Sequence, residues 1–266
     1  MIVWLNDALI NAEEMRIDPA DRGFLLGDGL FETIAVRTGK ILRLESHLAR
    51  LKLGCEVLSL PYPSLDFKTA IEALCVANDF TDAAIRLTLT RGPAPRGLLP
   101  PEKPQLVLLI SAASWPGAPP PARCVIATVT RRNEYSPLAS IKSVDYLDNI
   151  LARQEAAKRG ANEAILLNTK GRVAESSAAN LFVVKEGRMI TPPVEEGALP
   201  GVMRAAVLNA YKGIQAPLEV GDLAMADAIF LTNSLGIRAV TSLEGKSVGN
   251  GARAFMEDVR TKVEGG

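Results

Sequence analysis

Three consecutive prolines, Pro119 to Pro121, constrain the fold of this 266-residue chain more than any other feature. Proline fixes its φ angle and has no backbone N–H, so the run excludes a helix and favours an extended spacer. We therefore expect a small N-terminal domain over residues 1–112 and a larger C-terminal domain over residues 123–266. A proline-rich linker over residues 113–122 would join them.

The composition predicts a globular protein that acts on a small molecule. Apolar residues make up 48% of the chain, which is enough for two packed cores. Thirty basic residues balance thirty acidic ones, so the net charge predicts neither a nucleic acid nor an anionic membrane as partner. The N-terminus has no signal-peptide pattern and no stretch is long enough to span a membrane, which predicts a cytoplasmic location. The cysteines, Cys55, Cys75 and Cys124, are widely spaced and are expected to be buried thiols.

The first domain is expected to combine a sheet with helices. Alternation and turn signals predict strands over residues 2–5, 30–36, 41–44, 84–90 and 105–111, and apolar spacing predicts helices over residues 45–58 and 64–78. Three glycines between residues 21 and 33 match no nucleotide-binding fingerprint, and we expect them to let the backbone approach a ligand. The single histidine, His47, argues against a metal cluster and is expected to be a helix-surface or capping residue.

Two arginines lie in the proline-rich loop between the last two of these strands. They are Arg91 and Arg96, in the sequence Arg-Gly-Pro-Ala-Pro-Arg. A guanidinium group binds a carboxylate through two parallel hydrogen bonds, so this loop is a candidate carboxylate clamp. The sequence leaves open which of the two arginines faces the ligand.

Lys142 is the candidate reacting group of the second domain. Taken alone it would be an ordinary solvated lysine, as most lysines are. It lies just before or at the start of a helix expected from about residue 143 or 145 to residue 159, ending at Gly160. This helix is expected to turn Leu147, Ile150 and Leu151 inward. A strand over residues 123–130 precedes it, and further strands are expected over residues 163–167, 181–184, 228–232 and 238–241.

Polar motifs follow Lys142 along the chain. Glu175 and Asn180 bracket four small residues before an apolar strand. Pro200 and Gly201 then precede a helix expected to reach about residue 212, and the free N–H groups at such a helix start can hold a phosphate. The loop after residue 232 contains Ser234, whose hydroxyl is a second candidate phosphate ligand.

Together these motifs resemble those of the fold-type IV pyridoxal-phosphate enzymes, the class IV aminotransferase family. The matching motifs are Lys142 with residues 144–147, Glu175 with residues 180–182, residues 201–204 and residues 232–234. The resemblance runs from Trp4 to about Thr241. It implies an α+β fold with a small N-terminal α/β domain and a larger, β-barrel-like C-terminal domain with helices. It also implies pyridoxal 5′-phosphate as cofactor and a homodimer.

The resemblance implies a role for each matching residue. Lys142 would bind the cofactor covalently and move the substrate's α-proton, and Glu175 would face the pyridine nitrogen. The remaining cofactor contacts would be Arg50, Val202, Met203 and Ser234 at the phosphate, Tyr146 at the ring hydroxyl and Asn180 in the pocket wall. Phe31 would line the substrate pocket, with Arg96, or else Arg91, at a substrate carboxylate.

Sequence details favour one member of the family over the others. The branched-chain pattern Phe-Glu-Gly-x-Arg is here Phe31-Glu32-Thr33-Ile34-Ala35, and the histidine of the D-amino-acid aminotransferase loop is replaced by Leu98. The motifs are more similar to those of the aminodeoxychorismate lyases of folate biosynthesis, which convert 4-amino-4-deoxychorismate to 4-aminobenzoate and pyruvate. The alternatives are an aminotransferase acting on D-amino acids or, further from the pattern, branched-chain amino acids, and a cofactor-binding protein without turnover.

Overall fold

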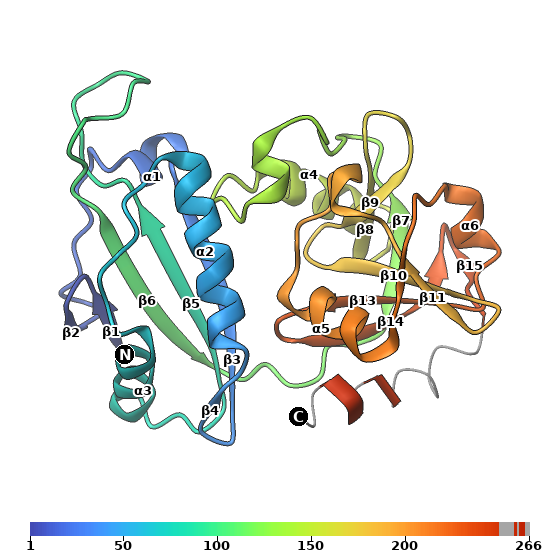
Figure 1. The fold of residues 1–266 in the computed structure, drawn as a ribbon, viewed down its shortest axis with the longest axis horizontal. Helices are drawn as coiled ribbons and strands as arrows, with labels where there is room; N and C mark the ends of the chain where they lie inside the picture. Colours follow the sequence, from blue (N-terminus) through green and yellow to red (C-terminus); the bar gives the residue numbers. More distant parts are fainter. Residues whose placement is uncertain (250–257, 260, 264–266) are drawn as a thin grey trace. The chain divides into compact units, whose positions relative to one another are not determined.

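The structure is a computed structural model that describes residues 1–249, 258–259 and 261–263 (Figure 1). The chain divides into two compact units. The first comprises Met1–Gly117 and Ile141–Asp145, and the second comprises Ala118–Ser140 and Tyr146–Gly266. The boundary after Gly117 falls inside the expected proline-rich linker. Lys142 belongs to the short segment that groups with the first unit.

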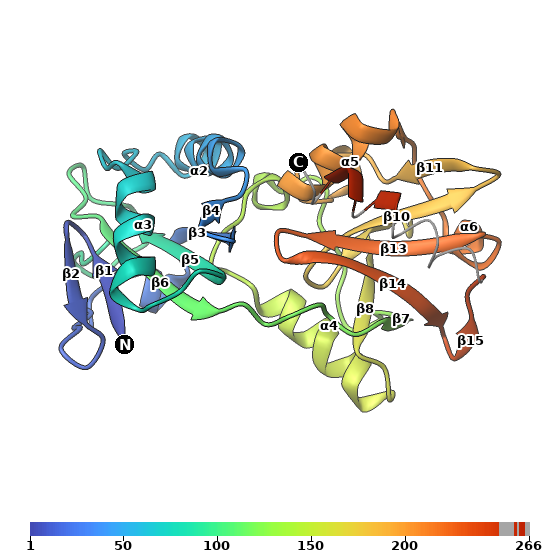
Figure 2. The same cartoon turned by 90° about the horizontal axis from the view of Figure 1, so that it is seen from below.

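The first unit is an antiparallel sheet covered on one face by two helices. The strands are β1 (Ile2–Leu5), β2 (Ala8–Asn11), β3 (Gly29–Arg37), β4 (Lys40–Ile41), β5 (Ala83–Thr90) and β6 (Val107–Ser114), in the order β2-β1-β6-β5-β3-β4. The helices are α1 (Arg22–Leu26), α2 (Leu44–Leu58) and α3 (Phe67–Ala77). Figures 1 and 2 show α2 and α3 beside this sheet.

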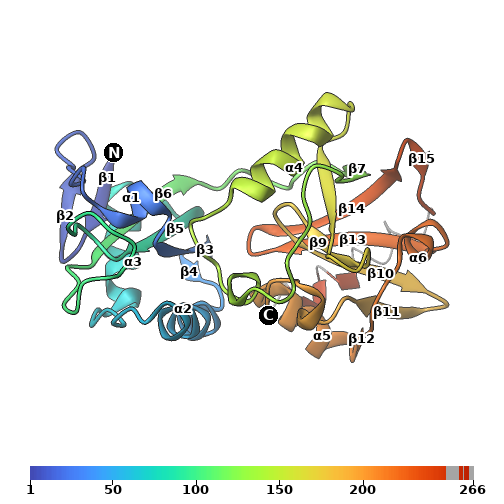
Figure 3. The same cartoon turned by 90° about the horizontal axis from the view of Figure 1, so that it is seen from above.

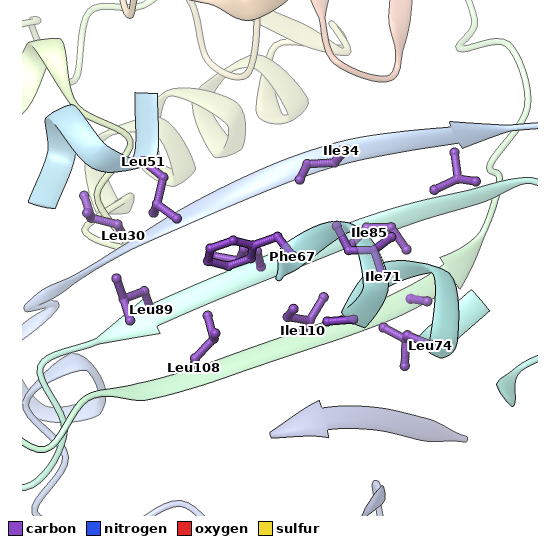
Figure 4. Close-up of a cluster of buried hydrophobic side chains, with 14 of the residues drawn as sticks. Leu30, Ile34, Leu51, Phe67, Ile71, Leu74, Ile85, Leu89, Leu108 and Ile110 are labelled. Carbon is purple, nitrogen blue, oxygen red and sulfur yellow. The ribbon is translucent and has the colours of Figure 1, made fainter. Parts of the chain in front are cut away.

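Alternation along the strands places one hydrophobic core between this sheet and the helices (Figure 4). Leu30 and Ile34 of β3 and Ile85 of β5 belong to the same core as Leu51 of α2 and Ile71 of α3. The opposite side of β3 carries Phe31, Thr33 and Ala35. Even-numbered residues of β3 therefore face the helices, and odd-numbered residues face away from them.

The second unit contains a nine-stranded mixed sheet. Its strands are β7 (Ala122–Ile126), β8 (Glu163–Leu167), β9 (Val173–Ser176), β10 (Asn180–Lys185), β11 (Arg188–Thr191), β12 (Ile214–Gln215), β13 (Ala228–Asn233), β14 (Gly236–Leu243) and β15 (Lys246–Ser247). The order is β12-β11-β10-β13-β14-β7-β8-β9, and β15 pairs with β14. The helical segments are η1 (Pro137–Ser140), α4 (Leu147–Lys158), η2 (Val194–Glu196), α5 (Val202–Tyr211) and α6 (Val220–Ala224).

Three separate clusters of buried side chains flank this second sheet. One face gathers Leu181, Ile229 and Val240 in a single core shared by most of the strands. On the other face, the rings of Phe182 and Phe230 stack with their centroids 5.0 Å apart and pack against α5, while the alanines of α4 pack against β8. Figure 3 shows α4 beside β8. This combination of sheets and covering helices confirms the expected α+β class.

Helix α4 differs from its prediction in the residues that it buries. Leu147, Ile150 and Leu151 were expected to face inward, but their side chains are 67%, 48% and 43% exposed. The buried face of α4 consists of Asn149, Ala152 and Ala156 instead. The prediction was wrong because apolar character alone set the phase of the helix, whereas small alanines allow α4 to lie close to β8.

All three cysteines are buried free thiols, as predicted, and burial raises the pKa of Cys124 to about 12.

Two of the glycines between residues 21 and 33 pack closely on β5. A Cβ on Gly23 would lie 2.2 Å from Thr90, and one on Gly29 would lie 2.5 Å from the Leu89 carbonyl oxygen. The expected approach of this stretch to a ligand stays a prediction.

Within the described ranges, no helix is long and apolar enough to cross a membrane. Over the same residues, no group of three or more histidine, cysteine or carboxylate side chains is placed to hold a metal ion.

Candidate active site

Backbone hydrogen bonds hold the segment that contains Lys142 against β3. The Phe31 N–H donates to the Lys142 carbonyl oxygen at 2.9 Å, and the Val144 N–H donates to the Gly29 carbonyl oxygen at 3.0 Å. These bonds add residues 142–144 to the edge of β3. They also explain why α4 begins only at Leu147, later than predicted.

The amine of Lys142 lies over an aromatic ring together with a second cation. Its Nζ is 4.3 Å from the centroid of the Phe31 ring, and the Arg86 guanidinium carbon is 4.0 Å from the same centroid. Both distances are within the range of cation–π attraction. Phe31 therefore positions the amine from the face of β3 that points away from the helices, and Arg86 joins Lys142 as a second charged group there.

Arg50 lies on the opposite face of β3, where it pairs with a buried carboxylate. Its Nε and Nη2 donate to the two oxygens of Glu32 at 2.8 and 2.6 Å, and His47 Nδ1 lies 2.6 Å from the same carboxylate. All three side chains are buried. Burial alone would raise the pKa of Glu32, but the hydrogen bonds from Arg50 and His47 lower it below its usual range. His47 is therefore neither a surface nor a capping residue.

The two arginines of the expected clamp have different environments. Arg91 is buried, and its Nε donates to Asp28 while its Nη1 and Nη2 donate to the carbonyl oxygens of Ser59 and Leu58 at the end of α2. Arg96 is exposed and lines a pocket of about 530 Å³ between α1 and its own loop. The geometry therefore gives Arg91 a structural environment and leaves Arg96 as the arginine accessible to a ligand.

In the second unit, Glu175 is the centre of a polar cluster at the end of β9. Its Oε2 accepts a hydrogen bond from the Leu199 N–H at 2.9 Å, and its Oε1 lies 3.3 Å from Nη2 of Arg132. Arg132 Nε also donates to the Gly197 carbonyl oxygen at 3.1 Å. Glu175 itself is 5% exposed. A cation and a backbone N–H therefore hold this buried carboxylate in place.

Asn180 connects this carboxylate to the start of α5. Its Nδ2 donates to the Leu199 carbonyl oxygen at 2.8 Å and lies 3.4 Å from Glu175 Oε2. Its Oδ1 would be 1.9 Å from a Cβ on Gly201, so any larger residue at the N-cap of α5 would displace the Asn180 side chain. Within the part of the chain that the structure describes, no side chain caps this helix, and its first residues, Val202 and Met203, are buried. The helix therefore begins where the sequence predicted, and phosphate binding by its first N–H groups stays a prediction.

A buried hydroxyl lies in register with Asn180. Thr232 pairs with Asn180 across β13 and β10, and within the described residues its Oγ1 has no hydrogen-bond partner. The turn that follows contains Ser234 and is tied to the chain after β9 by a bond from Asn233 Nδ2 to the Ala178 carbonyl oxygen at 3.2 Å. A buried hydroxyl without a partner costs free energy unless a bound group satisfies it.

Comparison with known proteins identifies the family. The sequence model of the class IV aminotransferase family matches residues 29–243. This chain belongs to the class IV aminotransferase family. A relative from Methanocaldococcus jannaschii, provisionally named a branched-chain-amino-acid aminotransferase, is 31% identical over 98% of this chain and 97% of its own length. The D-alanine aminotransferase of Bacillus licheniformis is 30% identical over 99% and 96% of the two chains.

A solved structure adds the third activity of the family. A protein of Legionella pneumophila, provisionally named a 4-amino-4-deoxychorismate lyase, is similar to this chain with a TM-score of 0.86 and 31% identity, covering 93% of this chain and 94% of the other. Class IV aminotransferases depend on pyridoxal 5′-phosphate, and the residues present here fit that cofactor. The chain provides a primary amine at Lys142 and a buried carboxylate at Glu175. Among the described residues, it also offers a start of α5 that no side chain caps and a Thr232 hydroxyl without a hydrogen-bond partner.

The structure groups the predicted residues in each unit separately. In the first unit, Lys142 meets Phe31, while Arg50 pairs with Glu32. In the second, Glu175 meets Asn180 and the segment leading to Val202 and Met203, whereas Tyr146 is the half-buried residue before α4. The sequence analysis missed Arg86, Arg132, Glu32 and Thr232 as contributors. Alternation along β5 could have placed Arg86 near Phe31, but no sequence signal marked Arg132.

Proposed function

We propose that this class IV enzyme is a lyase that converts 4-amino-4-deoxychorismate to 4-aminobenzoate and pyruvate. The observation that carries the proposal is the arginine that contacts the same aromatic ring as Lys142. Arg86 lies over the same ring as the Lys142 amine, and Arg96 is the accessible arginine of the loop. The substrate has two carboxylates, one on its ring and one on its enolpyruvyl group, so two guanidinium groups match its charge.

Each residue then has a task in the reaction. When bound, pyridoxal phosphate supplies an electron sink that stabilises negative charge on the substrate carbon that bears the amine. Lys142 Nζ would take the ring proton from that carbon, and Phe31 would keep the amine in place. The ring becomes aromatic as its C–O bond to the enolpyruvyl group breaks, and the departing enol takes up a proton to become pyruvate. Glu175 would face the ring nitrogen and favour its protonated form. The residues that would hold the phosphate are Arg50, Val202 and Met203 through their N–H groups, and Ser234. Tyr146 would reach the ring hydroxyl, and Asn180 would form part of the pocket wall.

A class IV aminotransferase is the second candidate. The relative named D-alanine aminotransferase favours it, since the two chains are 30% identical over nearly their full lengths. In that reaction Lys142 would return the proton to a different carbon and the amino group would pass to a 2-oxo acid. A branched-chain substrate fits less well, because a charged guanidinium lies beside Phe31 where an apolar side chain would need to bind.

The experiment that separates the two is a turnover assay without any 2-oxo acid. The purified holoenzyme is incubated with enzymatically generated 4-amino-4-deoxychorismate, and 4-aminobenzoate and pyruvate are quantified. The lyase predicts equimolar products that are lost in Lys142→Ala. An aminotransferase would form neither product, and D-alanine would instead change the visible absorption of the bound cofactor. A protein that only binds the cofactor would show neither response.

We further propose that the enzyme is a homodimer. The support is apolar surface that a single chain leaves exposed: Leu147, Ile150 and Leu151 on α4, and Leu98 and Leu99 in the Arg96 loop at 82% and 89% exposure. Sedimentation velocity at micromolar concentration tests this, with a dimer expected for the wild type and a shift towards monomer for Leu151→Glu. A monomeric wild type would contradict it. The cytoplasmic location expected from the sequence stays a prediction.

A further inference from the structure

The glycine-containing stretch before β3 contains a carboxylate that joins two buried arginines. Asp28 Oδ2 accepts hydrogen bonds from Nε of Arg22 and Nε of Arg91, both at 2.7 Å. The two arginines are 5% and 3% exposed. Burial alone would raise the pKa of Asp28, but the hydrogen bonds from Arg91 and Arg22 lower it, so the group is a carboxylate at neutral pH.

Each arginine uses its remaining nitrogens to hold backbone carbonyl groups. Nη1 and Nη2 of Arg22 donate to the carbonyl oxygens of Gly97 and Leu98 at 2.8 and 2.9 Å. Those two residues directly follow Arg96. Arg91, at the beginning of the same loop, donates to the two carbonyl groups at the end of α2. Asp28 therefore connects both ends of the loop segment 91–98 to the core of the first unit.

Backbone bonds support the first half of this loop. The Arg22 N–H donates to the Gly92 carbonyl oxygen at 2.9 Å, and the Ala94 N–H donates to the Ala20 carbonyl oxygen at 3.3 Å. The second half contains Arg96, Gly97 and Leu98, all exposed, and Gly97 has a φ angle of 138°. Its described hydrogen bonds to the rest of the unit are the two from Arg22. The position of Arg96 is therefore fixed mainly by the Arg22 side chain.

We propose that Arg22 and Asp28 are positioning residues that hold the Arg96 loop in its substrate-binding conformation. The inference rests on the proposed role of Arg96 at a substrate carboxylate. It explains why the stretch before β3 combines an aspartate, an arginine and closely packed glycines, because these residues together support the loop over residues 91–98. The three guanidinium nitrogens of Arg22 are all engaged, by Asp28 and by the carbonyl oxygens of Gly97 and Leu98, so it acts on the substrate through the loop. Loss of Arg22 or Asp28 should therefore weaken substrate binding more than the chemical step.

The test uses Arg22→Lys in the holoenzyme. Lysine keeps a positive charge beside Asp28 but cannot hold Gly97 and Leu98 at the same time. Arg16→Lys is the matched control, because the exposed Arg16 also bonds two carbonyl groups, those of Glu13 and Met15, outside the loop. The first readout is the rate of trypsin cleavage after Arg96, which reports local opening. The second is KM and kcat with the amino substrate.

We expect Arg22→Lys to raise the cleavage rate after Arg96 by about tenfold and KM by about tenfold, with kcat and cofactor affinity close to wild type. Arg16→Lys should leave all four quantities unchanged. Unchanged cleavage after Arg96 in Arg22→Lys would overturn the inference, as would faster cleavage with an unchanged KM. If Arg22→Lys fails to fold, Asp28→Asn is measured in the same way.

The proposed function can fail separately. Arg96→Ala should raise KM without altering the fold; an unchanged KM in that variant would contradict the role of Arg96 at the substrate. An increase of KM in Arg96→Ala together with wild-type behaviour of Arg22→Lys would leave the proposed function standing and overturn only the anchoring by Arg22 and Asp28.

Discussion

Replacing Glu32 by glutamine tests the buried ion pair that supports Arg50. The side chain of Glu32 receives two hydrogen bonds from Arg50, at 2.8 and 2.6 Å, and one contact from His47 at 2.6 Å. Glutamine has nearly the same shape but no charge, and its amide nitrogen would face donors. The guanidinium of Arg50 would then lose its buried counter-charge while remaining 8% exposed.

The expected loss of stability follows from this burial. Removing one partner of a buried ion pair costs about 3–5 kcal/mol, because the other charge stays buried without compensation. Glutamine retains one acceptor oxygen, so we expect the lower end, about 3 kcal/mol of unfolding free energy. The exposed pair of Lys68 and Glu72 on α3 offers a matched control. Glu72→Gln should cost less than about 0.5 kcal/mol.

The assay is urea unfolding of the cofactor-free protein followed by tryptophan fluorescence. Both tryptophans, Trp4 and Trp115, lie in the first unit, so the signal reports the unit that contains Glu32. The pKa of Glu32 is lowered on folding, so its contribution is complete above the ordinary glutamate pKa of about 4.3 and is lost as the pH falls through the folded value. The stability difference between wild type and Glu32→Gln should therefore narrow below about pH 4. A difference below about 1 kcal/mol at pH 7 would refute this account of the pair.

Three further variants test other parts of the structure. Arg132→Gln should lower cofactor affinity about tenfold by removing the cation beside Glu175, whereas Arg131→Gln should not; fluorescence titration with pyridoxal phosphate measures both, and equal affinities would contradict the role of Arg132. Thr232→Val should leave the cofactor-free protein as stable as wild type or up to about 1 kcal/mol more stable, yet weaken cofactor binding, and a large loss of stability would show that its hydroxyl has a structural partner. Gly92→Ala should lower the free energy of unfolding in urea by more than about 3 kcal/mol, because its Cβ would lie 1.7 Å from a backbone oxygen. Gly39→Ala, with a similar φ angle but open space around its Cβ, should lower it by about 1 kcal/mol. Equal losses in the two variants would refute the steric argument.

Much of the fold follows from local pattern. Alternation along β3 and β5 predicted both strands nearly to their ends, and the α+β class is confirmed. The predicted end of a strand was wrong where a side chain, and not a neighbouring strand, accepts the backbone hydrogen bonds. The strand expected over residues 123–130 ends at Ile126, because the N–H groups of Thr128 and Val129 donate to the carboxylate of Glu155. That carboxylate lies on α4, and no local pattern could reveal the contact.

The sequence predicted those candidate site residues that lie in recognisable motifs, and it missed those that only a contact between distant segments brings to the site. Lys142, Glu175 and the start of α5 follow from ordered motifs with family spacing. Arg132 was missed because its contact with Glu175 joins residues 43 positions apart across an irregular segment. The choice between Arg91 and Arg96 was open in the sequence because both occur in the same loop. Their hydrogen bonds in the structure distinguish them.

Covalent attachment of the cofactor at Lys142 is the central claim of this account. The holoenzyme is reduced with borohydride, digested and mapped by mass spectrometry, with Lys170→Ala as a control, because it removes an exposed lysine whereas Lys142 is half-buried. The account predicts a single phosphopyridoxyl group on the peptide that contains Lys142, in wild type and in the control. A colourless protein that takes up no label, or a label on another lysine, would contradict it.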